Sequence, residues 1–331
     1  MFERARVLRL AEKHGCGFLQ RARSTAAVAV LSRVCVAEYT VSMHEFLKAP
    51  EHPEAAPSRL AARLWNTPVD EAEIALVGLP DDLGVSLNGG RVGAAEGPGA
   101  FRTALARYGA LEAAGINWPS VCDVGDVTPG ASLKETHDRV TAAVSAVLER
   151  GLFPVAIGGG HDLTYAFVRA VAGCGSLDAG VYFDAHLDVR AEEGSGMPFR
   201  RLVEDCGIKA LHVHGLDRYS NTAEHAAWFA AHGGTIDAFG PDDIWPGNDF
   251  FVSFDLDVID QAYAPGVSAM NPRGWAPDLA ERWVRAAGAS SKVRCFDIME
   301  LCPRHDQGGR TARLATRLFL AFLHGYSERV A

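Results

Sequence analysis

Short apolar runs alternate with longer amphipathic stretches from about residue 72 to the end of the chain. The runs are bounded by Gly, Pro and Asp residues, and they are apolar throughout instead of at every second position. Such runs are typical of strands that are buried on both faces. They predict strands over 73–80, 153–160, 179–186, 209–216, 249–260 and 293–301.

The stretches between these runs carry apolar residues at helical spacing. The second of them ends at Gly151, a residue that commonly follows the last turn of a helix. They predict helices over 97–111, 137–151, 161–173, 221–233, 277–289 and 310–326. Strands that alternate with helices indicate an α/β fold with a parallel sheet covered on both faces. Since no internal repeat or linker interrupts the pattern, residues 61–331 are predicted to form a single domain.

The first 60 residues have a different character. Residues 1–42 contain seven Lys or Arg against three Asp or Glu, and they are rich in Ala, as transit peptides are. Met43 opens an alternative start, and residues 49–58 form a Pro-rich connector. We expect residues 1–60 to be an N-terminal extension, either poorly ordered or the product of a mis-assigned start.

Charge and cysteine content narrow the functional classes. The net charge of the 331 residues is −9 without a basic block, so nucleic acid is not an expected partner. No apolar run approaches the ~20 residues that cross a bilayer, and we expect no membrane association. The seven cysteines are scattered and include no CxxC pair, which indicates reduced thiols and a cytoplasmic protein.

Side chains that can bind metals lie at or just after the ends of four of the predicted strands. In parallel sheets, sites form at the carboxyl ends of the strands. Residues two apart in extended backbone point the same way, so groups at that spacing converge on one patch. The residues concerned are His161, then Asp184, His186 and Asp188, then Asp255 and Asp257, and finally Glu300.

Aligned carboxylates in an apolar strand require a compensating charge, because they repel each other and lose hydration. No Lys or Arg occurs between residues 219 and 272. Two divalent ions about 3.5–4 Å apart could be bound by six of these groups, the two imidazoles and the four aspartates. A ligand set dominated by oxygen suits Mn²⁺ better than a metal that prefers thiolates. A purely structural acidic cluster is the alternative.

Three motifs together resemble the ureohydrolases, the family of arginase, agmatinase and formimidoylglutamase. They are GGGHD (158–162), FDAHLDVR (183–190) and SFDLDVID (253–260), and the resemblance covers about residues 72–325. It implies an arginase-like three-layer α/β/α sandwich with a mostly parallel central sheet, two Mn²⁺ per subunit and a homo-oligomer. Carried over by position, one ion takes His161, Asp184, Asp188 and Asp255, and the other takes Asp184, His186, Asp255 and Asp257.

Within the family, residues 88–105, 195–205 and 309–315 look most like formimidoylglutamase. No histidine lies between His186 and His212, where arginases carry one. The resemblance implies cleavage of the amidine C–N bond of N-formimidoyl-L-glutamate to L-glutamate and formamide, in histidine degradation. Gly194 and Met197 depart from the substrate loop of relatives. Guanidinobutyrase-, agmatinase- or arginase-like hydrolysis and a catalytically silent metal-binding scaffold therefore remain open.

Roles for the remaining polar residues follow from the chemistry of an amidine. Its cation needs a carboxylate, which we assign to Glu300, as the resemblance also implies. The leaving nitrogen needs a proton, and Asp257 is the expected carrier. The carboxylates of the substrate need donors, and the candidates are Asn88, Arg91, Arg190, Ser195 and Arg200.

Overall fold

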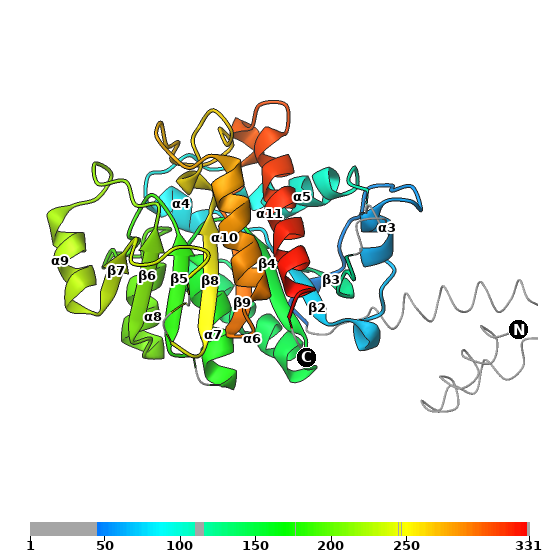
Figure 1. Cartoon of the computed structure of the whole chain (residues 1–331), viewed down its shortest axis with the longest axis horizontal. Coiled ribbons are helices and arrows are strands. Elements are labelled where there is room, and N and C mark those ends of the chain that lie inside the picture. Colours follow the sequence, from blue (N-terminus) through cyan, green and yellow to red (C-terminus); the bar gives the residue numbers. More distant parts are fainter. Residues whose placement is uncertain (1–44, 110–115, 176, 244, 246, 330–331) are drawn as a thin grey trace, which may run out of the picture. The chain divides into compact units, whose positions relative to one another are not determined.

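A nine-stranded sheet forms the centre of the protein (Figure 1). The computed structural model describes residues 45–109, 116–175, 177–243, 245 and 247–329. The strand order is β1-β3-β2-β4-β9-β8-β5-β6-β7, and every neighbouring pair is parallel except β1 with β3. Residues 1–44 of the predicted extension lie outside the described residues. None of the helices described combines the length and apolar character that crossing a membrane requires.

Six of the nine strands coincide with predicted ones, which confirms those predictions. The three that the hydrophobic pattern did not indicate are β1, β3 and β7. The bounds are β1 Leu47–Lys48, β2 Ile74–Leu79, β3 Val121–Val127, β4 Phe153–Gly158, β5 Ala179–Phe183, β6 Ala210–His214, β7 Gly234–Ile236, β8 Phe250–Asp255 and β9 Val293–Met299.

The hydrophobic pattern did not predict strand β3, because two carboxylates interrupt its apolar run. These carboxylates pair with a buried, positively charged side chain. Arg102 is only 2% exposed, and its guanidinium donates to Asp123 at 2.7 Å and to Asp126 at 2.7 Å. A buried charge of this kind needs paired and hydrogen-bonded partners. The acidic residues that break the apolar pattern of the strand are therefore the residues that hold Arg102 in place.

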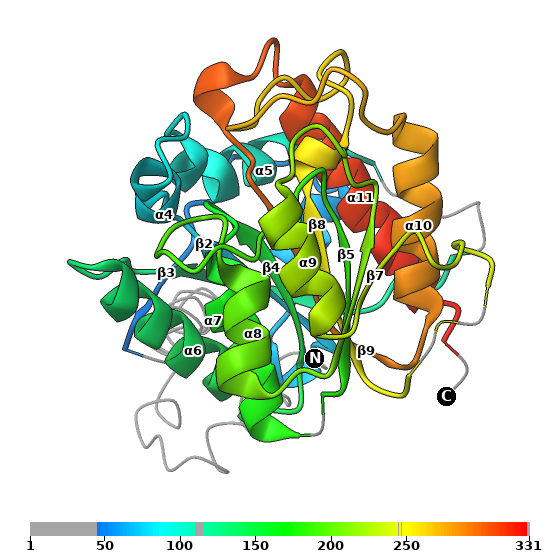
Figure 2. The same ribbon diagram turned by 90° about the vertical axis from the view of Figure 1, so that its left-hand side faces the viewer.

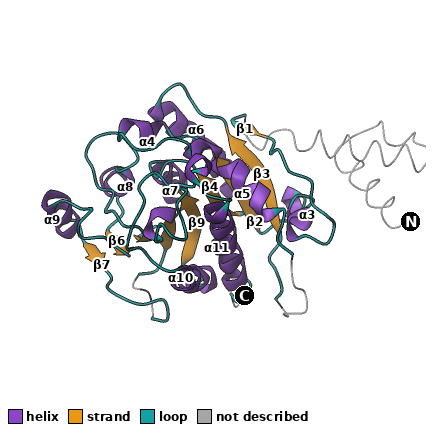
Figure 3. Cartoon of the chain, turned by 90° about the horizontal axis from the view of Figure 1, so that it is seen from above, coloured by secondary structure: helices purple, strands orange, loops and turns teal. Residues whose placement is uncertain are grey.

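The helices lie on both faces of the sheet, which confirms the three-layer α/β/α prediction. Figure 2 shows α6, α7 and α8 on one side of the strands and α10 and α11 on the other, and Figure 3 shows the same layers from above. The bounds are α3 Leu60–Leu64, α4 Leu83–Leu87, α5 Gly97–Leu105, α6 Leu133–Glu149, α7 Leu163–Cys174, α8 Pro198–Cys206, α9 Ala223–Ala231, α10 Pro277–Ala289 and α11 Arg310–Tyr326.

The central strands are anchored by apolar side chains that are completely buried. Ile157, Val181, Phe183, Val252 and Phe254 are each at most 1% exposed. Burying a side chain of this size contributes about 1.5–3 kcal/mol. The carboxyl ends of β4, β5, β8 and β9 are thus held by a rigid core, and the loops that follow them start from fixed positions.

Residues 45–60, the described part of the predicted extension, contact the sheet. Strand β1 pairs with β3, and the ring of His52 stacks on Trp65 with 4.5 Å between the centroids. His52 Nε2 also lies 2.9 Å from Asp123. The domain boundary at residue 61 stays a prediction.

Candidate metal centre

The residues that could bind metals converge because their strands are neighbours. Strands β4, β9, β8 and β5 are adjacent in the sheet and parallel, so their carboxyl ends meet at one edge. His161 follows β4, Glu300 follows β9, Asp255 ends β8, and Asp184 follows β5. All four are at most 3% exposed.

Tight turns, and not extended backbone, bring the closely spaced residues together. Strand β5 ends at Phe183 and β8 ends at Asp255, so the predicted strands over 179–186 and 249–260 were too long. The Asp184 carboxylate accepts the backbone N–H of His186 at 2.6 Å, and Asp255 accepts that of Asp257 at 2.8 Å. Aspartate commonly closes a turn by bonding the backbone two residues on. The convergence was predicted, but its predicted cause was wrong.

A first group of candidate ligands surrounds the Nδ1 atom of His161. This nitrogen lies 3.3 Å from Asp184 Oδ2, 3.0 Å from Asp188 Oδ2 and 3.0 Å from Asp255 Oδ2. One ligand atom from each of the four residues falls within 4.8 Å of the others. Three carboxylates and one imidazole that face one point match the oxygen-rich set preferred by hard divalent ions.

A second group shares Asp184 with the first. His186 Nδ1 lies 3.3 Å from Asp184 Oδ1 and 3.1 Å from Asp257 Oδ2. Asp184 therefore presents one oxygen to each group, as a carboxylate between two ions does. Asp255 belongs to the first group only. The sharing of Asp255 stays a prediction.

The electrostatics of the first group indicate more negative charge than its single imidazole balances. Burial raises the pKa of Asp184 to about 6 and that of Asp255 well above its usual value. Burial opposes a charge on His161, but Asp255, Asp184 and Asp188 raise its pKa well above the ordinary value. Carboxylates whose pKa values are raised in this way are stabilised in their charged form when a cation binds beside them.

Two ligand oxygens supply an independent test of the fit to a metal. Within the described chain, Asp184 Oδ2 and Asp257 Oδ1 are buried and accept no hydrogen bond. A buried carboxylate oxygen without a donor costs free energy that a native structure seldom leaves uncompensated. Divalent cations at the two groups would coordinate such oxygens, so the residues fit a metal pair.

Glu300 lies next to the first group with one oxygen available. Its Oε1 accepts the backbone N–H of His161 at 2.9 Å, whereas Oε2 is buried and has no donor among the described residues. Burial raises the pKa of Glu300 to about 8. The backbone of Glu300 is left-handed, with φ +65°, and so is that of Asp188, with φ +47°. Non-glycine residues are strained in this region, and such strain is concentrated at functional sites.

Asn88, Ser195 and Arg190 form a second cluster, which we call the rim. Asn88 Nδ2 donates to Ser195 Oγ at 3.1 Å, and Arg190 donates to Asn88 Oδ1 at 3.3 Å. A Cβ on Gly194 would lie 2.9 Å from Asn88 Oδ1, so the glycine at this position leaves room for the amide. Of the two positions expected to depart from relatives, Gly194 is thus the one in contact with the amide of Asn88.

The remaining two candidate substrate-binding arginines, Arg91 and Arg200, have other partners in the structure. Arg91 donates to the backbone carbonyls of Val267 and Ser268, at 2.5 and 3.0 Å, and so ties one loop to another. Arg200 lies on α8, where it pairs with Glu204 at 2.9 Å and covers the ring of Trp228 at 5.0 Å. These contacts engage its guanidinium on α8, and its role as a donor to the substrate stays a prediction.

The sequence analysis did not identify Ser253 and Asp297, which lie on the Nε2 side of His161. Its Nε2 lies 3.0 Å from Ser253 Oγ, which in turn donates to Asp297 Oδ1 at 2.6 Å. A signal was present, because Asp297 interrupts the apolar run of β9. An acidic residue inside a buried part of a strand requires a partner.

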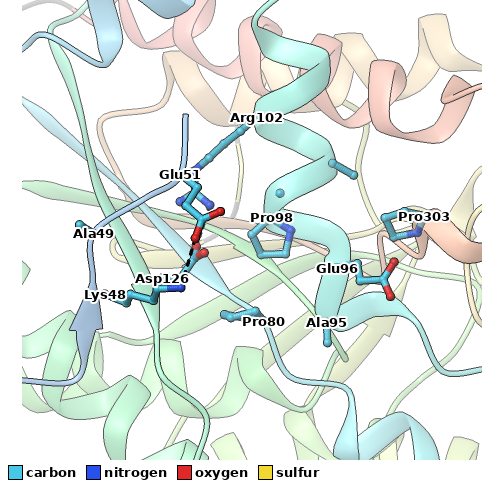
Figure 4. Close-up of a pocket in the computed structure, with 12 residues that line it drawn as sticks. Lys48, Ala49, Glu51, Pro80, Ala95, Glu96, Pro98, Arg102, Asp126 and Pro303 are labelled. Carbon is cyan, nitrogen blue, oxygen red and sulfur yellow. Dashed lines mark hydrogen bonds and ion pairs between the residues drawn. The ribbon is translucent and has the colours of Figure 1, made fainter. Parts of the chain in front are cut away.

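A cavity of about 470 Å³ lies outside both clusters (Figure 4). None of the candidate metal ligands lines it. Its charged lining residues are already paired: Lys48 with Glu51 at 3.4 Å, Arg102 with Asp126 at 2.7 Å, and Glu96 with Arg304. Because the lining of this cavity includes none of the candidate metal ligands, we place the chemistry at the strand ends.

Comparison with known proteins places the chain in a family. The model of the arginase family matches residues 72–325. The formimidoylglutamase of Ralstonia nicotianae is 34% identical over 290 residues, which are 78% of this chain and 86% of that protein. The formimidoylglutamase of Halobacterium salinarum is 36% identical over 278 residues, 77% of this chain and 89% of that protein.

Solved structures agree with these matches. The crystal structure of Trypanosoma cruzi formiminoglutamase with Mn²⁺ has a TM-score of 0.74 and 32% identity, covering 85% of this chain and 100% of that one. Formimidoylglutamase from Bacillus subtilis has a TM-score of 0.75 at 24% identity, covering 90% of this chain and 100% of that one, which shows the fold alone. The resemblance inferred from the three sequence motifs is confirmed, and the chain belongs to the arginase family.

Proposed function

We propose that this protein is a metal-dependent hydrolase that cleaves the amidine C–N bond of N-formimidoyl-L-glutamate to give L-glutamate and formamide, in histidine degradation. We place the activity in residues 61–331. The substrate is supported by relatives that are named formimidoylglutamase, and manganese is supported by the T. cruzi structure that contains it. The proposed cofactor is a pair of Mn²⁺ ions held by His161, Asp184, Asp188 and Asp255 and by Asp184, His186, Asp255 and Asp257.

The observation that carries the proposal is the position of Asp184 between the two ligand groups. One of its oxygens faces His161 and the other faces His186. A structural acidic cluster has no need of two imidazoles whose Nδ1 atoms point at one shared carboxylate. When bound, two ions at these groups would lower the pKa of a water in the site, so that hydroxide is available near neutral pH.

Glu300 and Asp257 would act on the substrate itself. An amidine is a cation near neutral pH, and beside it the raised pKa of Glu300 would fall, so that the unpaired Oε2 is the charged acceptor that holds it. Water adds to the amidine carbon, and the bond from this carbon to the glutamate nitrogen breaks. Asp257, which also belongs to the second ligand group, would take one proton of the attacking water and deliver it to that nitrogen, and the remaining hydroxyl proton would pass to the released amine as formamide forms.

The rim supplies the donors that a dicarboxylate substrate requires. Arg190 is exposed and offers a guanidinium beside the amide of Asn88 and the hydroxyl of Ser195. We propose that these three residues hold the carboxylates of the glutamate moiety. Arg91 contributes indirectly, because its donors hold the loop at Val267. A substrate such as agmatine, which lacks a carboxylate, leaves the rim unused.

The setting that we propose is a cytoplasmic homo-oligomer. A reducing compartment is supported by the described cysteines, all of which are free thiols: Cys122, Cys174, Cys206, Cys295 and Cys302. The homo-oligomer follows from the family resemblance alone. Sedimentation velocity of the purified protein measures it, and a single monomeric species would contradict it.

An assay of two products tests the proposed reaction. Protein loaded with Mn²⁺ is expected to release formamide from N-formimidoyl-L-glutamate and no urea from arginine, agmatine or guanidinobutyrate. Metal content is measured on the same sample, with two ions expected per subunit. Urea release would support one of the other amidino hydrolases. Bound metal without turnover of any of these compounds would support the silent scaffold.

A further inference from the structure

The two imidazoles of the metal centre differ in what their second nitrogen contacts. His161 is 1% exposed, and its Nε2 lies 3.0 Å from the hydroxyl of Ser253. The side chain of His186 is 28% exposed, and its Nε2 has no hydrogen-bond partner within the described part of the chain. Of these two imidazoles, therefore, that of His161 is held by a hydrogen bond at Nε2.

A short chain of hydrogen bonds continues from Ser253 into the sheet. Ser253 Oγ donates to Asp297 Oδ1 at 2.6 Å, and Thr164 Oγ1 donates to Asp297 Oδ2 at 3.1 Å. Ser253 on β8 and Asp297 on β9 are register partners, so the sheet itself sets this contact. All three side chains are 0% exposed.

The direction of these bonds determines where His161 carries its proton. A serine hydroxyl has a single hydrogen, and here that hydrogen points to Asp297. The Ser253 oxygen must then accept from the Nε2–H of His161. With the Nε2 proton donated to Ser253, Nδ1 is the nitrogen that faces Asp184, Asp188 and Asp255 and that would bind an ion once the ion displaces its proton. The ring is also held in orientation by Phe199, which packs edge-on at 5.2 Å between centroids.

We propose that Asp297 is a positioning residue that acts through Ser253 to fix the tautomer and orientation of His161 for one divalent ion. The inference rests on the proposed metal-dependent function. A carboxylate behind a ligating imidazole fixes the ring and increases its basicity. Its partners Ser253, Thr164 and the backbone of Phe254 are neutral, so among the described residues no cation pairs directly with the buried carboxylate of Asp297. An apolar residue would fill the same position in β9 without the cost of burying a charge.

Metal affinity of two variants tests the proposal directly. Asp297→Asn keeps the size of the side chain but removes its charge, and Ser253→Ala removes the link. Binding is measured by competition with a chromophoric chelator at fixed pH, with Mn²⁺ as the probe. Each variant is expected to bind one of the two ions about 10- to 100-fold more weakly and the other within about threefold. Excess Mn²⁺ is expected to restore most of the activity.

Two further comparisons separate positioning from a general effect on the fold. Cys295→Ala creates a cavity in the same buried strand, two residues before Asp297, and is expected to leave both affinities within about twofold. The double variant Ser253→Ala/Asp297→Asn is expected to bind no more weakly than the worse single variant, because both act through one link. If Asp297→Asn does not fold, Ser253→Ala carries the test, since it leaves Asp297 bonded to Thr164.

The failures are distinguishable. Wild-type protein that binds no divalent ion would overturn the proposed function, and this inference with it. Wild-type protein that binds two ions and releases formamide, with variants of unchanged affinity for both, would overturn only the role of Asp297. An equal loss at both ions would also overturn that role, because the contact with His161 reaches a single ligand group.

Discussion

The metal centre and the rim present opposite ways of building a site. The six candidate metal ligands extend from the ends of three strands, β4, β5 and β8, whose cores are fully buried, and most of them are buried themselves. The rim consists of side chains on two loops, and its charged member, Arg190, is exposed. The metal centre is positioned by the strand ends, whereas the rim is positioned by bonds between two loops: the backbone contact from Ser195 N–H to Gly84 O at 2.9 Å and the contacts between its own side chains. Chemistry is therefore expected to depend on the first, and substrate selection on the second.

Removal of the shared carboxylate is expected to have the largest effect. Asp184→Ala takes one oxygen from each ligand group, and we expect a loss of metal from both together with a fall in kcat/KM on the order of 10⁴ or more. Metal content by elemental analysis and formamide release are measured on the same preparation. Retention of two ions per subunit and of activity would contradict the role of Asp184 as the ligand shared by both groups, because a metal centre cannot lose its shared ligand without effect.

Glu300→Gln is expected to have a smaller effect that is confined to catalysis. The substitution keeps the shape of the side chain and an acceptor for the His161 N–H, but it removes the charge that pairs with the amidinium. Breaking a buried charge pair costs about 3 kcal/mol or more, which corresponds to about a hundredfold or more in kcat/KM. The measurement is steady-state kinetics at saturating Mn²⁺. Unchanged kinetics with normal metal content would remove Glu300 from the substrate site.

The apparent affinity for Mn²⁺ is expected to rise between pH 6 and 8. The raised pKa of Asp184, about 6, and the raised pKa values of Asp255 and His161 mean that the groups hold protons that the ion must displace. Lower pH therefore favours the protonated site, and each proton released makes the affinity rise about tenfold per pH unit. Calorimetry in two buffers of different ionisation enthalpy counts the protons. Binding without proton release would contradict the electrostatic description of the centre.

The metal centre could be predicted from the sequence, whereas the residues of the substrate site could be predicted only in part. Strand ends leave a clear pattern, an apolar run followed by Asp-x-His or Asp-x-Asp, and this pattern identified the residues that the structure brings together. The hydrophobic pattern could not reveal that aspartate side chains close the turns, or that the backbone of Glu300 is left-handed. Neither the closing of a turn nor a backbone angle depends on hydrophobicity. Nor could the pattern place Arg200, since a loop or helix arginine has the same composition whether it faces a substrate or pairs with Glu204. Strand β3 was missed because Asp123 and Asp126 bind Arg102 across the core.

The rim is expected to control binding and not the chemical step. Arg190→Ala removes a donor to the substrate carboxylates at an exposed position, so we expect KM to rise about tenfold with kcat within about twofold. The same change is expected to leave metal content unaltered. Kinetics over a range of substrate concentration measure the two constants. A large fall in kcat would indicate that the rim also positions the reacting carbon, and the separation between the two regions would fail.

Arg200→Ala supplies the matched comparison, and we expect it to have the smallest effect. Arg200 belongs to the same loop–helix segment as Ser195, but its guanidinium pairs with Glu204 and covers Trp228 on α8. A partly exposed pair of this kind contributes about 0–1 kcal/mol to stability. We therefore expect kcat and KM within about twofold of the wild type and a melting temperature lower by at most a few degrees, measured by the same assay and by thermal unfolding. A KM that rises as much as in Arg190→Ala would show that α8 moves to bring Arg200 to the substrate, and the rim would then need a second arginine.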